Sequence, residues 1–162
     1  MVKMISCDTS TKKSGLAVYI DGELFGYKLI DLSKEKNTEE RINHMIFALL
    51  SYIDIEKPNV IYCETPQGHG GNVKLARMLS SVIGAIKGWA CLNNCYFEEM
   101  NPSVWRKYID GFDQGNLSRP ELKLKGLMIV KERYGIDAES DDVSDAILIG
   151  KAMINRYGGM KG

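Results

Sequence analysis

Two short apolar segments of this 162-residue chain each end directly in an acidic residue. Residues 4–7 are followed by Asp8, and residues 60–63 are followed by Glu64. Both segments have the length and composition of buried strands. An acid placed directly after a core strand costs desolvation unless it has a partner. In an open α/β sheet the carboxyl ends of central strands meet at one edge, so we expect Asp8 and Glu64 to lie together there.

A second acidic pair, Asp142 and Asp145, opens an amphipathic segment near the C-terminus. Residues three apart share one face of a helix, so the two carboxylates can hold one metal ion or bridge two. Hard oxygen ligands of this kind suit Mg²⁺ or Mn²⁺. Acids at a helix N-terminus are also favoured by the helix dipole, so Ser140-Asp141-Asp142 alone could be only a cap and first turn. Together with Asp8 and Glu64, the Asp142/Asp145 pair favours a metal site.

The hydrophobic pattern predicts an α/β domain at residues 1–157. Asp21-Gly22 lies between alternating runs and predicts a hairpin, so we expect three antiparallel strands to open the fold. Helical spacing of apolar residues follows, from a cap at Asn37 or Thr38 to Pro58. The expected strands are 4–8, 14–20, 23–31, 60–64 and 96–100, and the later helices are 72–91, a short one from Asn101-Pro102 to Lys107, 119–134 and 140–157. A loop is expected at 110–118, and residues 158–162 are expected to fray.

Composition excludes several classes of protein. No stretch approaches a membrane span and no signal-like region opens the chain, so we expect no membrane partner and a cytoplasmic location. Two of the four cysteines lie in strand-like runs, where a free thiol acts as a small hydrophobe. Cys91 and Cys95 lack the two further ligands that a zinc site needs.

Any nucleic-acid surface must be local, because 21 basic and 21 acidic residues give a formal net charge of zero. Residues 101–135 carry a positive excess, and basic residues near the first turn and the helix at 72–91 could extend it. The alternative is a solvated helix face of mixed charge. The candidate contacts are Lys12, Lys13, Lys74, Arg77, Arg106, Lys107, Arg119, Lys123 and Lys125.

The helix predicted at 72–91 has a second stripe of small residues, which recur every four positions. Its members are Ala76, Ser80, Gly84 and Gly88. Glycine inside a helix costs about 1 kcal/mol relative to alanine, so close packing is the expected compensation. Either the helix lies flat on the sheet, or two copies meet at a subunit interface. We favour the interface, because a larger apolar stripe already supplies a sheet-facing side.

The order and spacing of these motifs resemble RuvC-type Holliday junction resolvases of bacteria and their phages, within the RNase H-like (retroviral integrase-like) nuclease superfamily. The resemblance runs nearly end to end and rests on residues 5–10, Ser14-Gly15, residues 58–64 with the following helix, and residues 142–146. It implies a five-stranded mixed sheet, with three antiparallel strands and then two parallel ones, flanked by helices.

The resemblance also implies an activity in DNA recombination and repair. Carried over by position, it makes Asp8, Glu64, Asp142 and Asp145 the ligands of two Mg²⁺ or Mn²⁺ ions, with no small-molecule cofactor. A homodimer would cut four-way DNA junctions by paired symmetric nicks, leaving 5′-phosphate and 3′-hydroxyl ends. Arg106, Lys107 and either Lys123 or Lys125 fall where the family contacts the DNA backbone, and the helix at 72–91 falls in the interface region.

The loop at 66–72 departs from the family pattern. It reads Pro-Gln-Gly-His-Gly-Gly-Asn, without the aromatic or apolar wedge that several relatives place at the junction centre. Strict selectivity for four-way junctions therefore does not follow from the resemblance. His69 in this loop could contact DNA or shuttle a proton, or it could be simply exposed.

Three rival functions stay open at this point. Another RNase H-like nuclease could cut flaps, forks or RNA–DNA hybrids with the same metal chemistry. Actin-like ATPases and sugar kinases also begin with an Asp followed by small residues, but they normally need two such domains. A non-catalytic DNA-binding scaffold would hold four acids against a phosphate backbone without a metal, which electrostatic repulsion disfavours.

Overall fold

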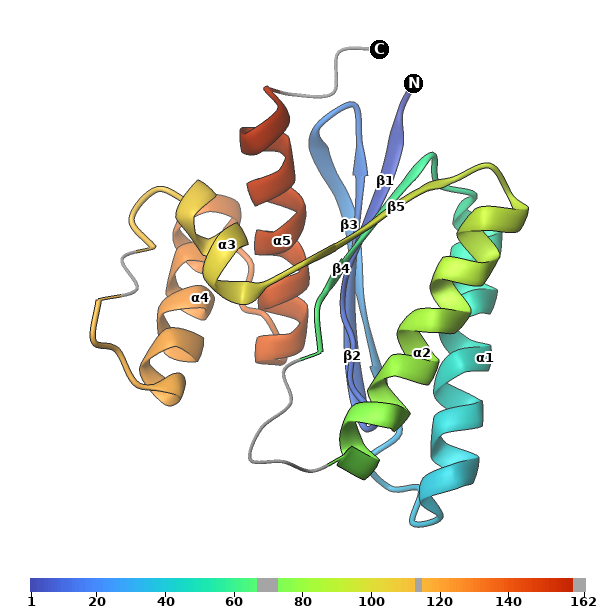
Figure 1. Ribbon diagram of the computed structural model, residues 1–162. Coiled ribbons are helices and arrows are strands. Elements are labelled where there is room, and N and C mark those ends of the chain that lie inside the picture. Colours follow the sequence, from blue (N-terminus) through green and yellow to red (C-terminus); the bar gives the residue numbers. More distant parts are fainter. Residues whose placement is uncertain (67–72, 113–114, 159–162) are drawn as a thin grey trace.

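A five-stranded mixed sheet forms the centre of the structure, a computed structural model that describes residues 1–66, 73–112 and 115–158 (Figure 1). Its strands lie in the order β3-β2-β1-β4-β5. β1 pairs antiparallel with β2 and parallel with β4, β2 pairs antiparallel with β3, and β4 pairs parallel with β5. The predicted arrangement of three antiparallel strands followed by two parallel ones is confirmed. The bounds are β1 (Lys3–Asp8), β2 (Lys13–Ile20), β3 (Glu23–Asp31), β4 (Val60–Glu64) and β5 (Tyr96–Met100).

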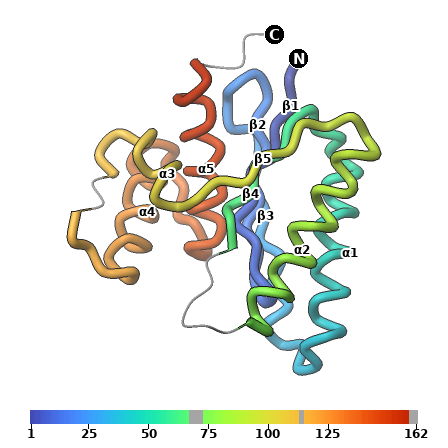
Figure 2. The backbone as a smooth tube through the Cα atoms, viewed as in Figure 1, coloured from blue at the N-terminus to red at the C-terminus, as the bar shows by residue number. Residues whose placement is uncertain are grey.

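Helices cover both faces of the sheet (Figures 1 and 2). α1 (Thr38–Glu56) and α2 (Val73–Leu92) pack on one face, and α5 (Asp141–Tyr157) packs on the other. α4 (Arg119–Tyr134) lies outside α5. After β5 come α3 (Pro102–Trp105) and a 3₁₀ turn (Arg106–Tyr108). Each face of the sheet thus has its own apolar core, and all the predicted helices are present.

α5 lies directly on β1 and β2. Two hydroxyl groups of these strands donate hydrogen bonds to the α5 backbone, and Gly15 has no side chain to keep the helix away. The hydroxyl groups of Ser6 and Tyr19 donate to backbone carbonyls of α5 at 2.6 and 2.7 Å. A Cβ atom on Gly15 would lie 2.0 Å from the carbonyl oxygen of Asp142. Gly15 is also the cross-strand partner of Asp8. The same position therefore brings the first turn of α5 next to the end of β1.

The small-residue stripe of α2 faces away from the sheet. Ser80 is exposed, and a Cβ atom on Gly84 or Gly88 would meet no atom of the described residues within 4 Å. Ala76 is partly buried. Close packing among the described residues therefore does not explain these glycines, and the interpretation in which this stripe lies flat on the sheet is wrong.

The expectation that no stretch of the chain approaches a membrane span needs correction. By length and composition alone, α2 is apolar enough to cross a membrane. Its charged residues hide this in the sequence, because they interrupt the apolar run. Val82, Ile83, Ile86 and Ala90 are buried against the sheet, so part of its apolar character serves the core.

Replacing Gly15 with alanine should destabilise the fold. The added methyl group would overlap the backbone of Asp142, which cannot move aside as a flexible side chain could. We expect the free energy of unfolding to fall by about 1–3 kcal/mol, as for other overpacked sites. In thermal unfolding, each kcal/mol lost should lower the unfolding temperature by about 2–4 °C for a chain of this size.

The matched control is Gly26→Ala in β3, where an added Cβ meets no described atom within 4 Å. The free energy of unfolding of this variant should stay within about 0.5 kcal/mol of that of the unaltered protein. Equal unfolding temperatures for the two variants would contradict the close contact at Gly15.

Candidate metal centre

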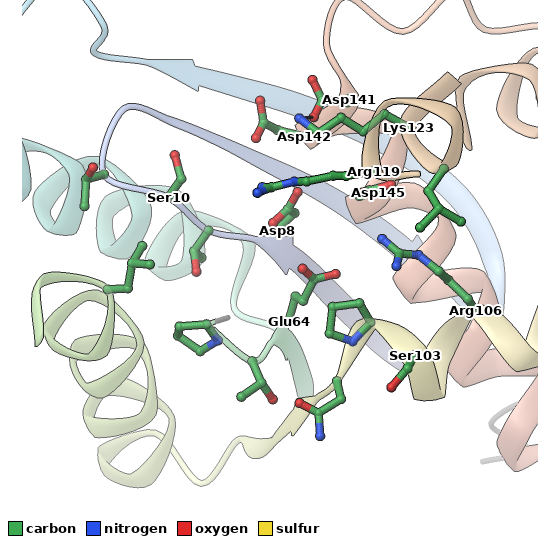
Figure 3. A pocket seen from close by; sticks show the side chains of 18 of the residues that line it. Asp8, Ser10, Glu64, Ser103, Arg106, Arg119, Lys123, Asp141, Asp142 and Asp145 are labelled. Atoms are coloured by element: carbon green, nitrogen blue, oxygen red, sulfur yellow. Dashed lines mark ion pairs between the residues drawn. The ribbon is translucent and has the colours of Figure 1, made fainter. Parts of the chain in front are cut away.

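The four predicted acids line one cavity of about 770 Å³ at the carboxyl edge of the sheet (Figure 3). Asp8 ends β1 and Glu64 ends the adjacent parallel strand β4, while Asp142 and Asp145 belong to the first turns of α5. The structure thus brings together residues from three distant parts of the chain. It adds a fifth acid, Asp141, which the sequence indicated only as part of a helix cap.

Burial and mutual repulsion oppose ionisation of these acids. Burial first, and then the charges of Glu64, Asp145 and Asp142, raise the pKa of Asp8 well above its ordinary value. Burial, and then the charge of Glu64, raise the pKa of Asp145 to about 7. Burial also raises the pKa values of Glu64 and Asp142. Clustered acids of this kind are costly unless positive charge compensates them.

The chemistry of these donors fits Mg²⁺ or Mn²⁺, although the side chains do not form a closed cage. Across residues 1–66, 73–112 and 115–158, no three His, Cys, Asp or Glu side chains are arranged to hold an ion by themselves. Mg²⁺ usually binds through one or two carboxylates together with waters and substrate phosphate oxygens. The open arrangement therefore fits an ion that shares its coordination sphere with a bound phosphate.

Glu64 is held at both its backbone and its carboxylate. The pairing of β4 with β5 extends to Glu64, which lies opposite Met100, and the Thr65 N–H donates to the Met100 carbonyl at 2.8 Å. The indole N–H of Trp105 donates to Glu64 Oε2 at 2.8 Å. Burial raises the pKa of Glu64 overall, and this hydrogen bond and the charge of Arg106 offset part of that rise. The sequence placed Trp105 on a short helix but gave no sign of this contact.

Basic side chains also line the cavity. Arg106 follows α3, and Arg119 and Lys123 lie in the first turns of α4. Lys123 forms an ion pair with Asp141. The Arg106 guanidinium lies over the Trp105 ring, 5.0 Å from its centroid. Acidic side chains suited to cations and basic side chains suited to phosphate therefore share one cavity.

The other predicted DNA contacts do not line this cavity. Lys12 is exposed in the turn after Asp8, and Lys13 is ion-paired with Asp31 at 3.3 Å. His69 lies outside the described residues, as do most of its loop and the end of the predicted tail. Lys74, Arg77 and Lys107 are exposed, and Lys125 is partly buried.

Comparison with known proteins identifies the fold. The sequence significantly matches no protein-family model and no curated protein sequence. Thermus thermophilus RuvC, solved in complex with a Holliday junction substrate, has a TM-score of 0.71 and 15% identity, covering 98% of this chain and 97% of that one. Fowlpox virus resolvase, solved with substrate Holliday junction DNA, has a TM-score of 0.66 and 16% identity, covering 96% and 99%. The yeast mitochondrial Holliday junction resolvase Ydc2 has a TM-score of 0.61 and 16% identity, covering 97% and 79%. The predicted RNase H-like fold of the RuvC type is confirmed.

The raised pKa of Asp145 predicts a loss of stability with rising pH in the metal-free protein. Folded Asp145 keeps a proton up to about pH 7, whereas the unfolded chain releases it near the ordinary value of 3.8. The folded state therefore binds more protons in this window, and the free energy of unfolding falls as pH rises through it. Asp145→Asn should reduce this fall, since the other raised acids still contribute to it, and should be more stable than the unaltered protein at about pH 8 by about 1–4 kcal/mol, with a smaller gain at about pH 5.

Urea unfolding in a chelator at both pH values measures this difference. Asp54→Asn, at an exposed acid of α1, is the control and should follow the unaltered protein. If Asp145→Asn keeps the full pH dependence of the unaltered protein, burial of this carboxylate is not what sets it.

Proposed function

We propose that the chain is a divalent-metal-dependent endonuclease that cleaves branched DNA, four-way junctions in particular, by paired symmetric nicks. The observation that carries the proposal is the convergence of Asp8, Glu64, Asp142 and Asp145 in a cavity that also contains basic side chains. A fold shared with resolvases that were solved on Holliday junction DNA supports this choice of substrate.

The acids and the bases of the cavity have separate tasks in this proposal. Asp8, Glu64, Asp142 and Asp145 would hold the ions. When bound, two such ions supply a nucleophilic water at neutral pH and neutralise charge on the attacking and leaving oxygens, with 5′-phosphate and 3′-hydroxyl products.

Arg106 and Arg119 bind the non-bridging oxygens of phosphates, because a guanidinium group matches phosphate with two parallel hydrogen bonds. The charge of Lys123 is neutralised by its ion pair with Asp141. A phosphate that displaces Asp141 from this pair would gain the positive charge of Lys123 as a further contact. Affinity then depends on this local group, because the whole chain has no net charge and attracts DNA weakly at a distance.

Symmetric nicks require two active sites, and we assign the second to a second copy of the chain. The exposed stripe of Ser80, Gly84 and Gly88 on α2 lets two helices approach closely. Leu75 and Leu79 of the same helix line the cavity. A dimer through α2 would therefore place each cavity beside the interface.

A panel of substrates distinguishes this function from that of a related nuclease. Four-way, three-way, forked, flapped and linear DNA and an RNA–DNA hybrid are offered with Mg²⁺ or Mn²⁺, and the nicks are mapped. Paired symmetric nicks in the four-way junction are expected. Single cuts confined to flaps, forks or hybrids would select the related nuclease instead.

Removing one predicted metal ligand should abolish cleavage and leave junction binding in place. We expect Asp8→Asn and Glu64→Gln each to lower the cleavage rate by more than about 100-fold, because each substitution removes an anionic ligand. Single-turnover cleavage and a gel-shift titration measure the two properties. Glu132→Gln, an exposed acid of α4, is the control and should cleave normally. Loss of binding with intact cleavage would refute the assignment.

Gly84→Leu should dissociate the proposed dimer. A leucine side chain on the exposed stripe would hold the two helices apart. Sedimentation velocity should show a monomer for this variant and a dimer for the unaltered protein. Asn43→Leu adds the same apolar group to the exposed face of α1 and should remain dimeric. A Gly84→Leu protein that sediments as a dimer would place the interface elsewhere.

A further inference from the structure

We infer that Trp105 is a positioning residue of the candidate metal centre, which fixes the Glu64 carboxylate and supports the Arg106 guanidinium. The inference rests on the proposed function, because it concerns how the same acids hold a metal ion. It follows from three contacts of the indole ring.

The first contact is the hydrogen bond from the indole N–H to Glu64 Oε2, at 2.8 Å. An indole N–H can only donate, so its partner here is a lone pair of the carboxylate. Oε1 and the remaining lone pair of Oε2 stay available for a cation. Figure 3 shows the Glu64 side chain directed toward Asp8. The contact thus restrains the carboxylate from behind while its front faces the cavity.

The restraint matters because the strand alone does not fix the side chain. Pairing with β5 holds the Glu64 backbone, but a glutamate side chain retains several rotatable bonds beyond it. Groups that hydrogen-bond to metal ligands set the orientation of those ligands, and their loss typically weakens metal binding or activity by about 10- to 100-fold. Trp105 stands in this relation to Glu64.

The second and third contacts make the indole itself immobile. Trp105 is fully buried, and Phe112 packs edge-on against it with ring centroids 5.8 Å apart. Arg106 lies over both rings, at 5.0 Å from Trp105 and 5.6 Å from Phe112. A single rigid ring therefore orients an acid of the candidate metal centre and supports a base of the same cavity.

The chain contains a matched control for this contact. Its other tryptophan, Trp89 on α2, donates its indole N–H to Asp54 Oδ1 at 3.2 Å. This contact has the same chemistry, but neither residue lines the cavity. Trp89→Phe therefore removes an indole–carboxylate hydrogen bond without touching the candidate metal centre.

The test compares Mn²⁺ binding by Trp105→Phe, Trp89→Phe and the unaltered protein. Free Mn²⁺ is measured by electron paramagnetic resonance without DNA, and cleavage of a four-way junction is then followed against Mn²⁺ concentration. We expect Trp105→Phe to bind Mn²⁺ about 10- to 100-fold more weakly and to recover part of its cleavage rate at high Mn²⁺. Trp89→Phe should match the unaltered protein. Equal Mn²⁺ affinity for the two variants would overturn the inference.

A double-mutant cycle with Glu64→Gln separates positioning from general packing. If Trp105 acts through the Glu64 carboxylate, Trp105→Phe should change Mn²⁺ affinity much less when Glu64 is already Gln. The same fold-change in both backgrounds would assign Trp105 a packing role only, against the inference.

Fluorescence provides a second readout if Trp105→Phe does not fold. In the Trp89→Phe protein Trp105 is the sole tryptophan. Paramagnetic Mn²⁺ bound beside Glu64 should quench the emission of Trp105, and Glu64→Gln should shift this quenching to higher Mn²⁺ concentration. Emission unchanged at Mn²⁺ saturation would overturn the inference.

Failure of the proposed function gives a different result. An unaltered protein that binds no Mn²⁺ and cuts no substrate of the panel overturns that function, and the inference with it. An unaltered protein that does both, beside a Trp105→Phe variant that behaves like Trp89→Phe, overturns the inference alone.

Discussion

The close contact between the first turn of α5 and the β1–β2 hairpin is the constraint on which the candidate site depends. At Gly15 the backbone of Asp142 occupies the space that a side chain would fill. Because Gly15 pairs with Asp8, this contact sets the spacing between the end of β1 and the acids of α5. The parallel pairing of β1 with β4 brings Glu64 to the same edge. Backbone packing, and not any attraction among the acids, therefore assembles the cluster.

The assembled cluster is unfavourable for the fold by itself. Burial and the charges of its neighbours raise the pKa values of Asp8 and Asp145, so the folded protein resists the ionised state that metal binding requires. α4 packs closely over this region, since a Cβ atom on Gly126 would lie 3.4 Å from Asp145 Oδ1. The same helix carries Arg119 to the cavity. Stability is given up at the place where a cation and a phosphate would restore it.

The sequence predicted the features that depend on local pattern. Alternating runs around Asp21-Gly22, the acids after two core strands and the Asp142/Asp145 spacing led to the mixed sheet and to four acids in one cavity. The contact of Trp105 with Glu64 was not predictable, because 41 positions separate the two residues and only the tertiary fold brings them together. Asp141 was missed for another reason, since an acid in a first helical turn is already explained by the helix dipole. The apolar length of α2 was missed because its charged residues interrupt the run in the sequence, although its mean hydropathy is still that of a possible membrane span.

Anomalous X-ray diffraction from a crystal soaked in Mn²⁺ would show whether these acids bind a cation, because it locates the ion independently of any activity. We expect a strong peak at the carboxyl edge of β1 and β4, within about 2–2.5 Å of carboxylate oxygens of Asp8 and of Glu64 or Asp145. Mn²⁺ bound only elsewhere on the molecule, with these carboxylates bare at a saturating concentration, would contradict it.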